Sequence, residues 1–374
     1  MAKAVYVGVG SKAHKMKKAY IGIGGKARKV KKMYIGVGGK ARLCYSAELE
    51  RYGMAAALST TRYDMRAATV GKYALFAGGL ARKSSFGYSV SSSVDAYNTS
   101  LTKSTPTELS CKRCGHAAAS VGGYALFAGG ASSYNLLGIY ENLVSAVDAY
   151  DASLTRSAAH IIGATVAIGG AAVGNYALFA GGTVYSQINE DNVTSDVLAY
   201  DPSLTFTTAP LLSVARANVK GASAGNYALF AGGRAGSFCT TVDAYNASLT
   251  RTTATALSST KNNSAAATVG NHAIFVGNTA SADIYDASLT KTSAAILSTA
   301  RTGLAATTVG DYAIFSGGGV ADFCDASLTR SSIGTSMTGY DMGAATIGDY
   351  ALFAGGQSGE NSGTAYDSVE VYTA

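Results

Sequence analysis

The 374-residue sequence contains no tryptophan, only three prolines and five cysteines, and 14% of its residues are charged. An odd number of cysteines in a chain of this length argues against a disulfide scaffold and for reduced thiols in a protein made in the cytosol. The low charge, together with 48% hydrophobic residues, excludes a disordered chain. Abundant Gly, Ser, Thr, Tyr and Val, with few helix formers, argue against an all-α fold.

Acidic residues are absent from residues 1–44, which contain ten lysines and two arginines and so have a formal charge of +12. The remaining residues have 30 − 12 = 18 basic and 23 acidic side chains, a net charge of −5. This asymmetry predicts a separate basic arm with an acidic partner, which could be nucleic acid, an anionic surface or a protein. The N-terminus lacks the apolar core of a signal peptide, and the uncharged run 157–189 is too rich in glycine for a membrane helix. We expect no membrane insertion.

Seven copies of one apolar motif organise the chain after the arm. The motif YALFAGG or a close variant begins at Tyr73, Tyr124, Tyr176, Tyr227, His272, Tyr312 and Tyr350. A second motif of the VDAYDASLT type follows each of the first six copies, and the chain ends soon after a shortened seventh copy, VEVY, at 369–372. Internal repeats with a period near 40–50 residues are typical of propellers and solenoids.

Each repeat predicts four short strands, here called a to d from the axis outward. Strand a has the AAATVG pattern, strand b is YALFAGG, strand c is VDAY, and strand d follows the Asp/Asn-Ala-Ser turn. Strand b is apolar on both faces, as expected for a sheet packed between two neighbours. Seven such units predict an all-β, seven-bladed β-propeller over residues 46–374.

The ring of blades has to close, because an open propeller would expose the edges of its sheets. The seventh repeat ends before its strand d, whereas Glu48–Ser59 has the strand-d pattern with no blade before it. We therefore expect this N-terminal segment to cross the seam and complete blade seven.

Charged residues recur at fixed places in the repeat. A basic residue lies eleven positions before the first motif in five copies, at Arg62, Arg113, Arg216, Lys261 and Arg301. Thr165 and Gly339 replace it in copies three and seven. An aspartate lies near the start of strand c, at Asp95, Asp148, Asp243, Asp283 and Asp322. A group present in most blades indicates a structural role rather than one acid–base pair. We expect no enzymatic activity and no cofactor.

The glycine pair after an apolar strand, the Tyr-Asp pair and the later arginine resemble the repeat of the Kelch family over residues 48–374. Leucine occupies the region where that family has a strand-d tryptophan, at Leu101, Leu154, Leu204, Leu249, Leu289 and Leu328. This simplified repeat looks like that of bacterial and phage-borne Kelch proteins. The resemblance implies the propeller fold and leaves the function open.

The basic arm, residues 1–45, has its own repeat, with Tyr6, Tyr20 and Tyr34 spaced by 14 positions. Alternating residues predict a small β-meander. Its GIGGKA and GVGGKA segments lack the Ser/Thr and the helix of a phosphate-binding loop. The arm resembles Gly/Lys repeats at the front of phage and prophage virion-associated proteins, which implies docking to other virion proteins. The basic residues assigned to docking are Lys12, Lys15, Lys17, Lys18, Lys26, Arg28, Lys29, Lys31, Lys32, Lys40 and Arg42.

Loops between strands b and c vary in length, whereas the a–b and c–d turns at the other end are short and uniform. Blades 7, 1, 2 and 3 have b–c loops of 12, 14, 16 and 14 residues, against 8, 3 and 2 in blades 4, 5 and 6. We expect a lopsided rim that binds a sugar or a protein, the alternative being that its aromatic residues only pack the loops together. The candidate rim residues are Phe86, Tyr88, Tyr134, Tyr140, Glu141, Tyr185, Glu190, Asp191, Phe238, Glu360 and Tyr366.

A CxxC pair, Cys111 and Cys114, lies close to His116. Zinc needs four ligands, usually two such pairs, and the other cysteines lie in other repeats or in the arm. We interpret both cysteines as small residues that enter a strand, and we expect no metal site.

These patterns favour a non-enzymatic protein of a phage tail, baseplate or fibre, made in the bacterial cytoplasm and present in the virion in several copies. It would dock through its arm and display the propeller for binding of a host-surface glycan or protein. One alternative is a structural or decorating virion protein without a receptor. Another is a cytosolic bacterial Kelch scaffold whose arm binds nucleic acid, although we expect nucleic acid to be an unlikely partner.

Overall fold

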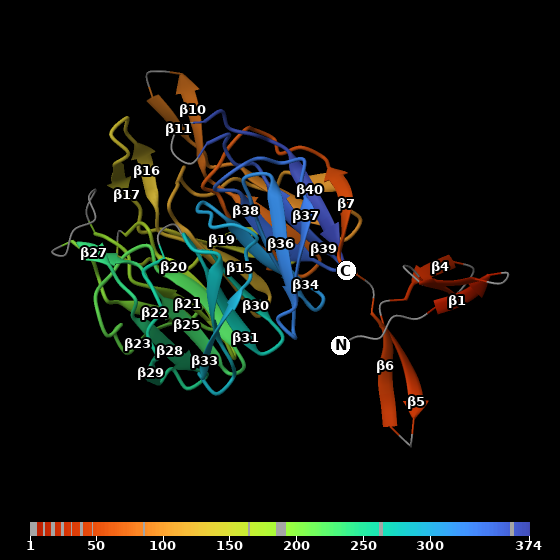
Figure 1. The fold of residues 1–374 in the computed structure, drawn as a ribbon. Coiled ribbons are helices and arrows are strands. Elements are labelled where there is room, and N and C mark those ends of the chain that lie inside the picture. The colour runs from red at the N-terminus through yellow and green to blue at the C-terminus, as the bar shows by residue number, and fades with distance from the viewer. Residues whose placement is uncertain are drawn as a thin grey trace.

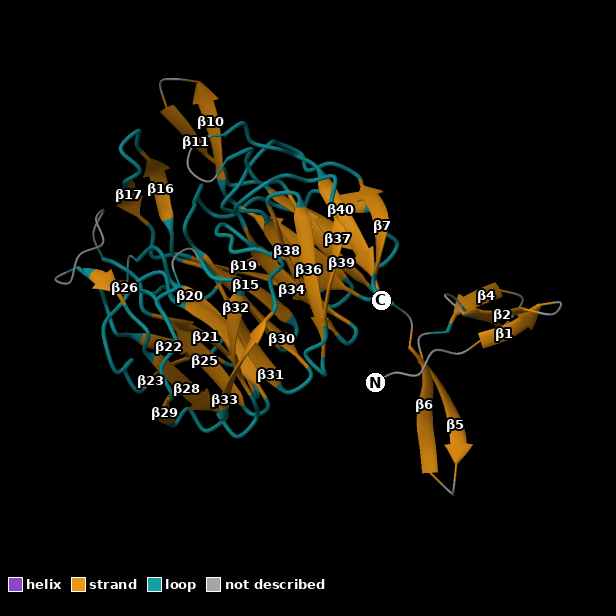
Figure 2. Cartoon of the chain, viewed as in Figure 1, coloured by secondary structure: helices purple, strands orange, loops and turns teal. Residues whose placement is uncertain are grey.

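The computed structural model describes residues 6–9, 12–15, 19–23, 26–30, 32–37, 40–46, 48–84, 87–163, 165–184, 192–261, 265–359 and 363–374. These residues form strands, turns and loops without a helix (Figure 2), and therefore include no helix that could cross a membrane. The all-β expectation is confirmed.

Seven four-stranded antiparallel sheets form the blades of a β-propeller (Figure 1). The inner strands a are β8 (Arg66–Val70), β14 (Ala117–Val121), β20 (Gly169–Val173), β24 (Lys220–Ala224), β30 (Ala265–Val269), β34 (Ala305–Val309) and β38 (Gly343–Ile347). The strands b are β9 (Tyr73–Ala77), β15 (Tyr124–Ala128), β21 (Tyr176–Ala180), β25 (Tyr227–Ala231), β31 (His272–Val276), β35 (Tyr312–Gly317) and β39 (Tyr350–Ala354).

The two outer strands complete each blade. The strands c are β12 (Val94–Asn98), β18 (Val147–Asp151), β22 (Val197–Tyr200), β28 (Val242–Asn246), β32 (Ser281–Tyr285), β36 (Val320–Asp325) and β40 (Val369–Thr373). The strands d are β13 (Lys103–Ser104), β19 (Arg156–Ala158), β23 (Phe206–Ala209), β29 (Arg251–Ala254), β33 (Lys291–Ala295), β37 (Arg330–Gly334) and, for blade seven, β7 (Glu50–Ala55).

The ring closes where the two ends of the propeller sequence meet. Strand β7 pairs antiparallel with β40, and Ala55 lies opposite Val369 in that pairing. Figure 1 shows the orange-red β7 beside the blue β40. Strand β38 of blade seven also contacts β8 of blade one, so the inner strands form a continuous circle. The expected closure by the N-terminal segment is confirmed.

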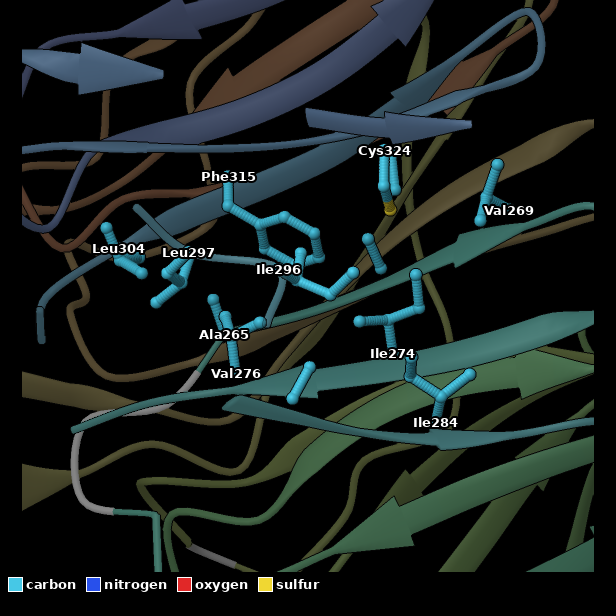
Figure 3. Close-up of a cluster of buried hydrophobic side chains, with 13 residues drawn as sticks. Ala265, Val269, Ile274, Val276, Ile284, Ile296, Leu297, Leu304, Phe315 and Cys324 are labelled. Atoms are coloured by element: carbon cyan, nitrogen blue, oxygen red, sulfur yellow. The ribbon is translucent and has the colours of Figure 1, made fainter. Parts of the chain in front are cut away.

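The core lies between adjacent blades. In Figure 3, Ile274 and Ile284 of blade five face Phe315 and Cys324 of blade six, and all four side chains are fully buried. Similar clusters join the other neighbouring blades. Strand b is thus buried on both faces, which explains why its sequence is apolar throughout rather than alternating.

A buried ion pair links the repeat's basic residue to its aspartate. Arg62 Nη2 lies 2.7 Å from Asp95 Oδ2, and Arg216 Nη2 lies 2.9 Å from Asp243 Oδ2, with all four side chains fully buried. The equivalent pairs are Arg113–Asp148, Lys261–Asp283 and Arg301–Asp322. Each arginine also donates to backbone carbonyl groups, for example from Arg62 to Phe76. These charges therefore hold the blade together, as the repetition indicated.

The leucine of the c–d turn has a left-handed backbone in six blades, for example φ = 65° at Leu154. The side chain of Asp151 holds this turn by accepting hydrogen bonds from the amides of Ser153 and Thr155, both at 2.9 Å. Leu154 then packs against the core shared by blades one and two. This contact offsets the strain of a positive φ, about 1–2 kcal/mol for a residue other than glycine.

The described part of the arm consists of three separate hairpins rather than one meander. The hairpins pair β1 (Tyr6–Val9) with β2 (Lys12–Lys15), β3 (Tyr20–Ile23) with β4 (Lys26–Lys29), and β5 (Lys32–Val37) with β6 (Lys40–Ser46). The expectation of a continuous meander was wrong. A charge of +12 over the first 44 residues disfavours the joining of these short strands edge to edge. The division between residues 45 and 46 stays a prediction.

Candidate functional site

A ring of backbone hydrogen bonds surrounds the propeller axis at the end that carries the b–c loops. It involves the residue two positions after the repeat's basic residue, which has a left-handed backbone in each of the six blades where it is described. The amides of Asp64, Ala167, Asn218 and Asp341 donate to carbonyl groups of the preceding blade at 2.7–2.9 Å. We call this set the axial ring: Asp64, Gly115, Ala167, Asn218, Gly303 and Asp341, with φ between 50° and 62°.

Below the axial ring the inner strands approach one another closely. A Cβ atom added at Gly221 would lie 2.2 Å from the carbonyl oxygen of Gly170 in the preceding blade. Hydroxyl groups bridge other inner strands, since Ser120 Oγ donates to Thr69 O at 2.7 Å and Thr268 Oγ1 donates to Ser223 O at 3.0 Å. The inner strands therefore pack closely along the propeller axis, and the open space lies at the end of the axis that carries the b–c loops.

A cavity of about 250 Å³ opens at this mouth, and we call it the axial pocket. The axial ring contributes Asp64, Asn218, Gly303 and Asp341. The inner strands contribute Arg66 and Lys220, and the b–c loops contribute tyrosines and Gln357. The complete lining is Tyr63, Asp64, Arg66, Leu80, Tyr88, Tyr134, Tyr140, Asn218, Lys220, Gly303, Leu304, Asp341, Met342 and Gln357.

The acidic residues of the axial pocket differ in how they are satisfied. Asp64 accepts a hydrogen bond from Arg66 Nη1 at 2.8 Å and one from the amide of Gly115 at 3.0 Å. Asp341 Oδ2 accepts one from Gln357 Nε2 at 3.0 Å. Burial and the nearby charge of Asp64 raise the pKa of Asp341 to about 6. Both oxygens of the Asp64 carboxylate therefore accept hydrogen bonds from the protein. The Asp341 carboxylate can still accept a hydrogen bond from a ligand.

Lys220 supplies the second basic group of the axial pocket. Among the described residues its ammonium group has no hydrogen-bond or ion-pair partner, in contrast to the basic residues of the blade ion pairs. Burial, with the positive charge of Arg66, lowers the pKa of Lys220 to about 8, against the opposing effect of the two aspartates. A half-buried ammonium group without a partner is costly unless something else satisfies it.

Three tyrosines from two loop hairpins gather at the edge of the axial pocket. The hairpins are β10 (Leu80–Ser84) with β11 (Gly87–Val90), and β16 (Ala131–Tyr134) with β17 (Tyr140–Leu143), and both project from the propeller in Figure 2. The ring centroids of Tyr88 and Tyr134 are 5.0 Å apart, and those of Tyr134 and Tyr140 are 5.1 Å apart. Burial raises the pKa of Tyr134 to about 12 and that of Tyr140 well above its usual value, so both hydroxyl groups stay protonated.

The structure thus brings together three of the predicted rim residues, Tyr88, Tyr134 and Tyr140. They contact one another, as the packing alternative requires, and they also line a cavity, as a binding rim requires. Two other elaborated loops, in blades four and seven, form a short hairpin of β26 (Arg234–Ala235) with β27 (Ser237–Phe238) and a bridge between Gln357 and Ala365.

The other predicted rim residues lie away from the axial pocket or are not described. Glu141 accepts a hydrogen bond from Asn135 at 2.7 Å within its own hairpin. Phe238 is 41% exposed and lies under the guanidinium of Arg234. Tyr366 lines a separate cavity beside Met54. The predictions that fall outside the described residues are Phe86, Tyr185, Glu190, Asp191 and Glu360.

For the arm, the structure describes backbone strands but not the basic side chains assigned to docking. Lys17, Lys18 and Lys31 lie outside the described residues. The remaining docking residues lie on β2, β4, β5 and β6. Their role in docking stays a prediction.

Our sequence reasoning missed the charged residues of the axial pocket. The signal was available as departures from the repeat. The position of Lys220 is Arg66 in blade one and Ala or Gly in the other five blades, at Ala117, Gly169, Ala265, Ala305 and Gly343. Asp64 and Asp341 likewise stand where blades two and six have glycine. An alignment of the seven repeats, searched for positions that differ, would have found them.

Several large apolar side chains are exposed in the loops at the same end of the propeller. Leu136 and Leu137, at the tip of the β16–β17 hairpin, are 55% and 83% exposed. Others lie in the b–c and d–a connections of blades two to four. We call this set the apolar rim: Leu136, Leu137, Ile161, Val184, Leu211, Val214 and Phe238. These side chains are the candidates for an apolar contact surface at this end of the propeller.

The CxxC segment has no metal-binding arrangement among the described residues, where no group of three or more His, Cys, Asp or Glu side chains could hold an ion. Cys114 is fully buried, and its thiol donates to the carbonyl of Ala131 at 3.5 Å. Burial raises the pKa of this thiol and lowers the pKa of His116 well below its usual value. His116 packs beside Phe127 in the core.

The fold and the site together define a seven-bladed β-propeller with a polar pocket at one end of its axis. Comparison with family models gives no match, and comparison with curated proteins gives no significant match.

Proposed function

We propose that the protein is a non-enzymatic phage virion protein of the Kelch type, located in a tail, baseplate or fibre. Its basic arm docks to an acidic virion surface, and its propeller binds a glycan on the host cell. The observation that carries the binding role is the axial pocket, where unrepeated charged groups meet tyrosines from the elaborated loops.

The chemistry of the axial pocket suits a sugar. Its volume of about 250 Å³ is below the roughly 300 Å³ at which pockets for drug-sized ligands begin, and so favours a small unit such as one sugar residue. Asp341, Gln357 and Asn218 can exchange hydrogen bonds with hydroxyl groups. Tyr88 and Tyr140 offer aromatic surface together with a polar tip.

The arm and the copy number complete the proposal. A single small pocket gives modest affinity, and several propellers on one particle would raise the overall avidity by two to four orders of magnitude. The segment with a charge of +12 supports docking to an acidic neighbour.

A binding assay with the full-length chain tests this function. Labelled protein is titrated onto a panel of bacterial strains and onto immobilised surface glycans. We expect saturable binding that Tyr88→Ala weakens at least tenfold, because this residue lines the axial pocket. Tyr52→Ala, on the outer strand β7 where the side chain is 56% exposed, is the matched control and should bind as the parent does. Equal binding by the parent and Tyr88→Ala would refute the pocket as the receptor site.

The apolar rim favours a second candidate, a decorating virion protein without a receptor. In that role the exposed Leu136 and Leu137 would be covered by a neighbouring subunit. The double variant Leu136→Ser/Leu137→Ser would then lose incorporation into particles, measured by the protein content of purified virions. Under the receptor proposal the double variant is incorporated as the parent is, because docking runs through the arm.

The arm also allows the third candidate, a scaffold that binds nucleic acid. About twelve cations would release many counterions, so binding to DNA or RNA would weaken steeply between 50 and 200 mM salt. The virion proposal instead predicts one protein partner and no such binding in a mobility-shift assay at 150 mM salt.

A further inference from the structure

The charges of the axial pocket do not cancel in pairs. Arg66 and Asp64 form an ion pair at 2.8 Å. Lys220 and Asp341 remain, and no ion pair joins them among the described residues. One pocket therefore presents an unpaired ammonium group together with a carboxylate that has one oxygen occupied by Gln357.

The repeat shows why there is room for a ligand beside Lys220. The equivalent residue in the next blade is Ala265, and in the two blades after that it is Ala305 and Gly343. These small residues leave the mouth open on one side of the lysine. In the preceding blade the position is Gly169, where a Cβ atom would come within 2.9 Å of the Val219 carbonyl. At this position of strand a, the preceding blade and the three following blades thus place no long side chain beside Lys220.

We propose that the axial pocket binds an acidic sugar, with the carboxylate of the sugar at Lys220 and its hydroxyl groups at Asp341 and Gln357. This inference rests on the proposed function and names the kind of glycan that the pocket selects. A ligand carboxylate supplies the missing partner of the ammonium group, and that charge-assisted contact is stronger than one between neutral groups.

A carboxylate fits better than a phosphate ester. Asp64 and Asp341 both line the axial pocket, so a dianion would meet about twice the repulsion of a monoanion. A neutral sugar offers the Lys220 ammonium group only hydroxyl oxygens, which are weaker acceptors for it than a carboxylate. The preferred ligand is therefore a singly charged sugar such as a hexuronic acid.

Calorimetric titration of the full-length protein with four sugars tests the inference. The ligands are D-glucuronic acid, its methyl ester, D-glucose and glucose 6-phosphate. We expect glucuronic acid to bind at least tenfold more tightly than each of the other three. Lys220→Met should lose this advantage, and Lys220→Arg should keep most of it. Lys72→Met removes the same charge from an exposed turn at the opposite end of the propeller and should change nothing.

The pH dependence gives a second readout. The titratable or charged groups that face Lys220 in the axial pocket are Tyr63, Asp64, Arg66, Tyr88, Tyr134, Tyr140 and Asp341. Because Lys220 loses its proton above a pKa of about 8, affinity for glucuronic acid should fall as the pH rises from 7 to 9.5. Affinity of Lys220→Arg should stay constant over that range.

The outcomes separate this inference from the proposed function. Equal affinities for the acid and its ester, or unchanged affinity in Lys220→Met, would overturn the role of Lys220. Tighter binding of glucose than of glucuronic acid would overturn the inference and leave a glycan-binding propeller in place. Tightest binding of glucose 6-phosphate would replace the carboxylate by a phosphate and equally overturn it. Thermal unfolding of each variant confirms that it is folded.

Discussion

The blade wall and the axial mouth are built from the same repeat but use charged residues differently. By the blade wall we mean strands b and c with their ion pairs, and by the axial mouth the axial ring and the axial pocket. In the wall, Arg216 is fully buried and meets Asp243 at 2.9 Å. At the mouth, Lys220 lies only four residues later in the chain and meets no partner among the described residues. Repetition thus marks a role that most blades share, and a departure from it marks a local role.

In blade three the wall changes as a unit. In this blade, Thr165 stands at the position of the repeat's basic residue and Leu198 at that of the aspartate. Phe206 stands at the position that is basic in strand d of the other blades. Phe206 stacks on His160 with ring centroids 4.4 Å apart. All charged members are lost together, as expected if a single unpaired charge in this place would be costly.

We expect the largest loss of stability when the strand pairing that closes the ring is removed. Deletion of residues 369–374 removes β40, in which Val369, Val371 and Tyr372 are fully buried. Burial of each such side chain contributes about 1.5–3 kcal/mol, so we expect a loss of more than about 5 kcal/mol in the free energy of unfolding. Denaturant unfolding measures it. Unchanged stability would mean that ring closure does not hold the propeller together.

The second largest loss of stability is expected when one partner of a buried ion pair is removed. Asp243→Leu leaves the buried guanidinium of Arg216 without its carboxylate, and we expect a loss of about 3–5 kcal/mol. The triple variant Arg216→Thr/Asp243→Leu/Arg251→Phe copies blade three into blade four and should recover most of that loss. If the triple variant is less stable than Asp243→Leu alone, the wall does not change as a unit.

Removing a charge from the axial mouth should stabilise the protein, whereas removing one from the blade wall destabilises it. A pKa of about 8 for Lys220 against 10.5 for a free lysine means that the unfolded chain binds more protons between these values, so stability rises with pH across that window. Lys220→Met removes the penalty and should stabilise the protein at pH 7 by up to about 3 kcal/mol, at 1.36 kcal/mol per pKa unit. The gain should vanish near pH 10.5. Paired denaturant titrations at pH 7 and 10.5 measure both, and a loss of stability at pH 7 would make Lys220 part of the scaffold.

Asp341 gives a slightly smaller effect with the reverse pH dependence. Its pKa is raised from 3.8 to about 6, so the folded protein binds more protons between these values and stability falls as the pH rises through them. Asp341→Asn should therefore stabilise the protein at pH 7, by an amount at or below that of Lys220→Met, and the difference should disappear near pH 4. A constant difference at both pH values would assign the effect to the Gln357 hydrogen bond instead.

The fold could be predicted from the sequence because each blade repeats its signals. The YALFAGG motif and its variants are apolar throughout, which predicts a strand buried on both faces in every blade. The seventh repeat lacks its strand d, which predicts that another segment completes that blade. Loop lengths also identified the end that carries the candidate site, with Tyr88, Tyr134 and Tyr140.

The remaining features depended on geometry that strand patterns do not encode. Asp64 and Asp341 are far apart in the chain and meet only because the d–a connections place left-handed residues around the axis. Phe238 has the same aromatic character as the rim tyrosines, yet it lies in a short hairpin and does not line the axial pocket. The prediction of a meander for the arm was wrong because alternating residues specify strands but not which strands pair.

The measurement that tests the central claim most directly follows stability and binding in one variant. Lys220→Met and the parent are compared by unfolding at pH 7 and by titration with glucuronic acid. The account predicts that the variant is more stable and binds at least tenfold more weakly, since a charge kept at a cost to folding serves a ligand. A variant that is less stable and binds as the parent does would contradict it and would place Lys220 with the blade wall.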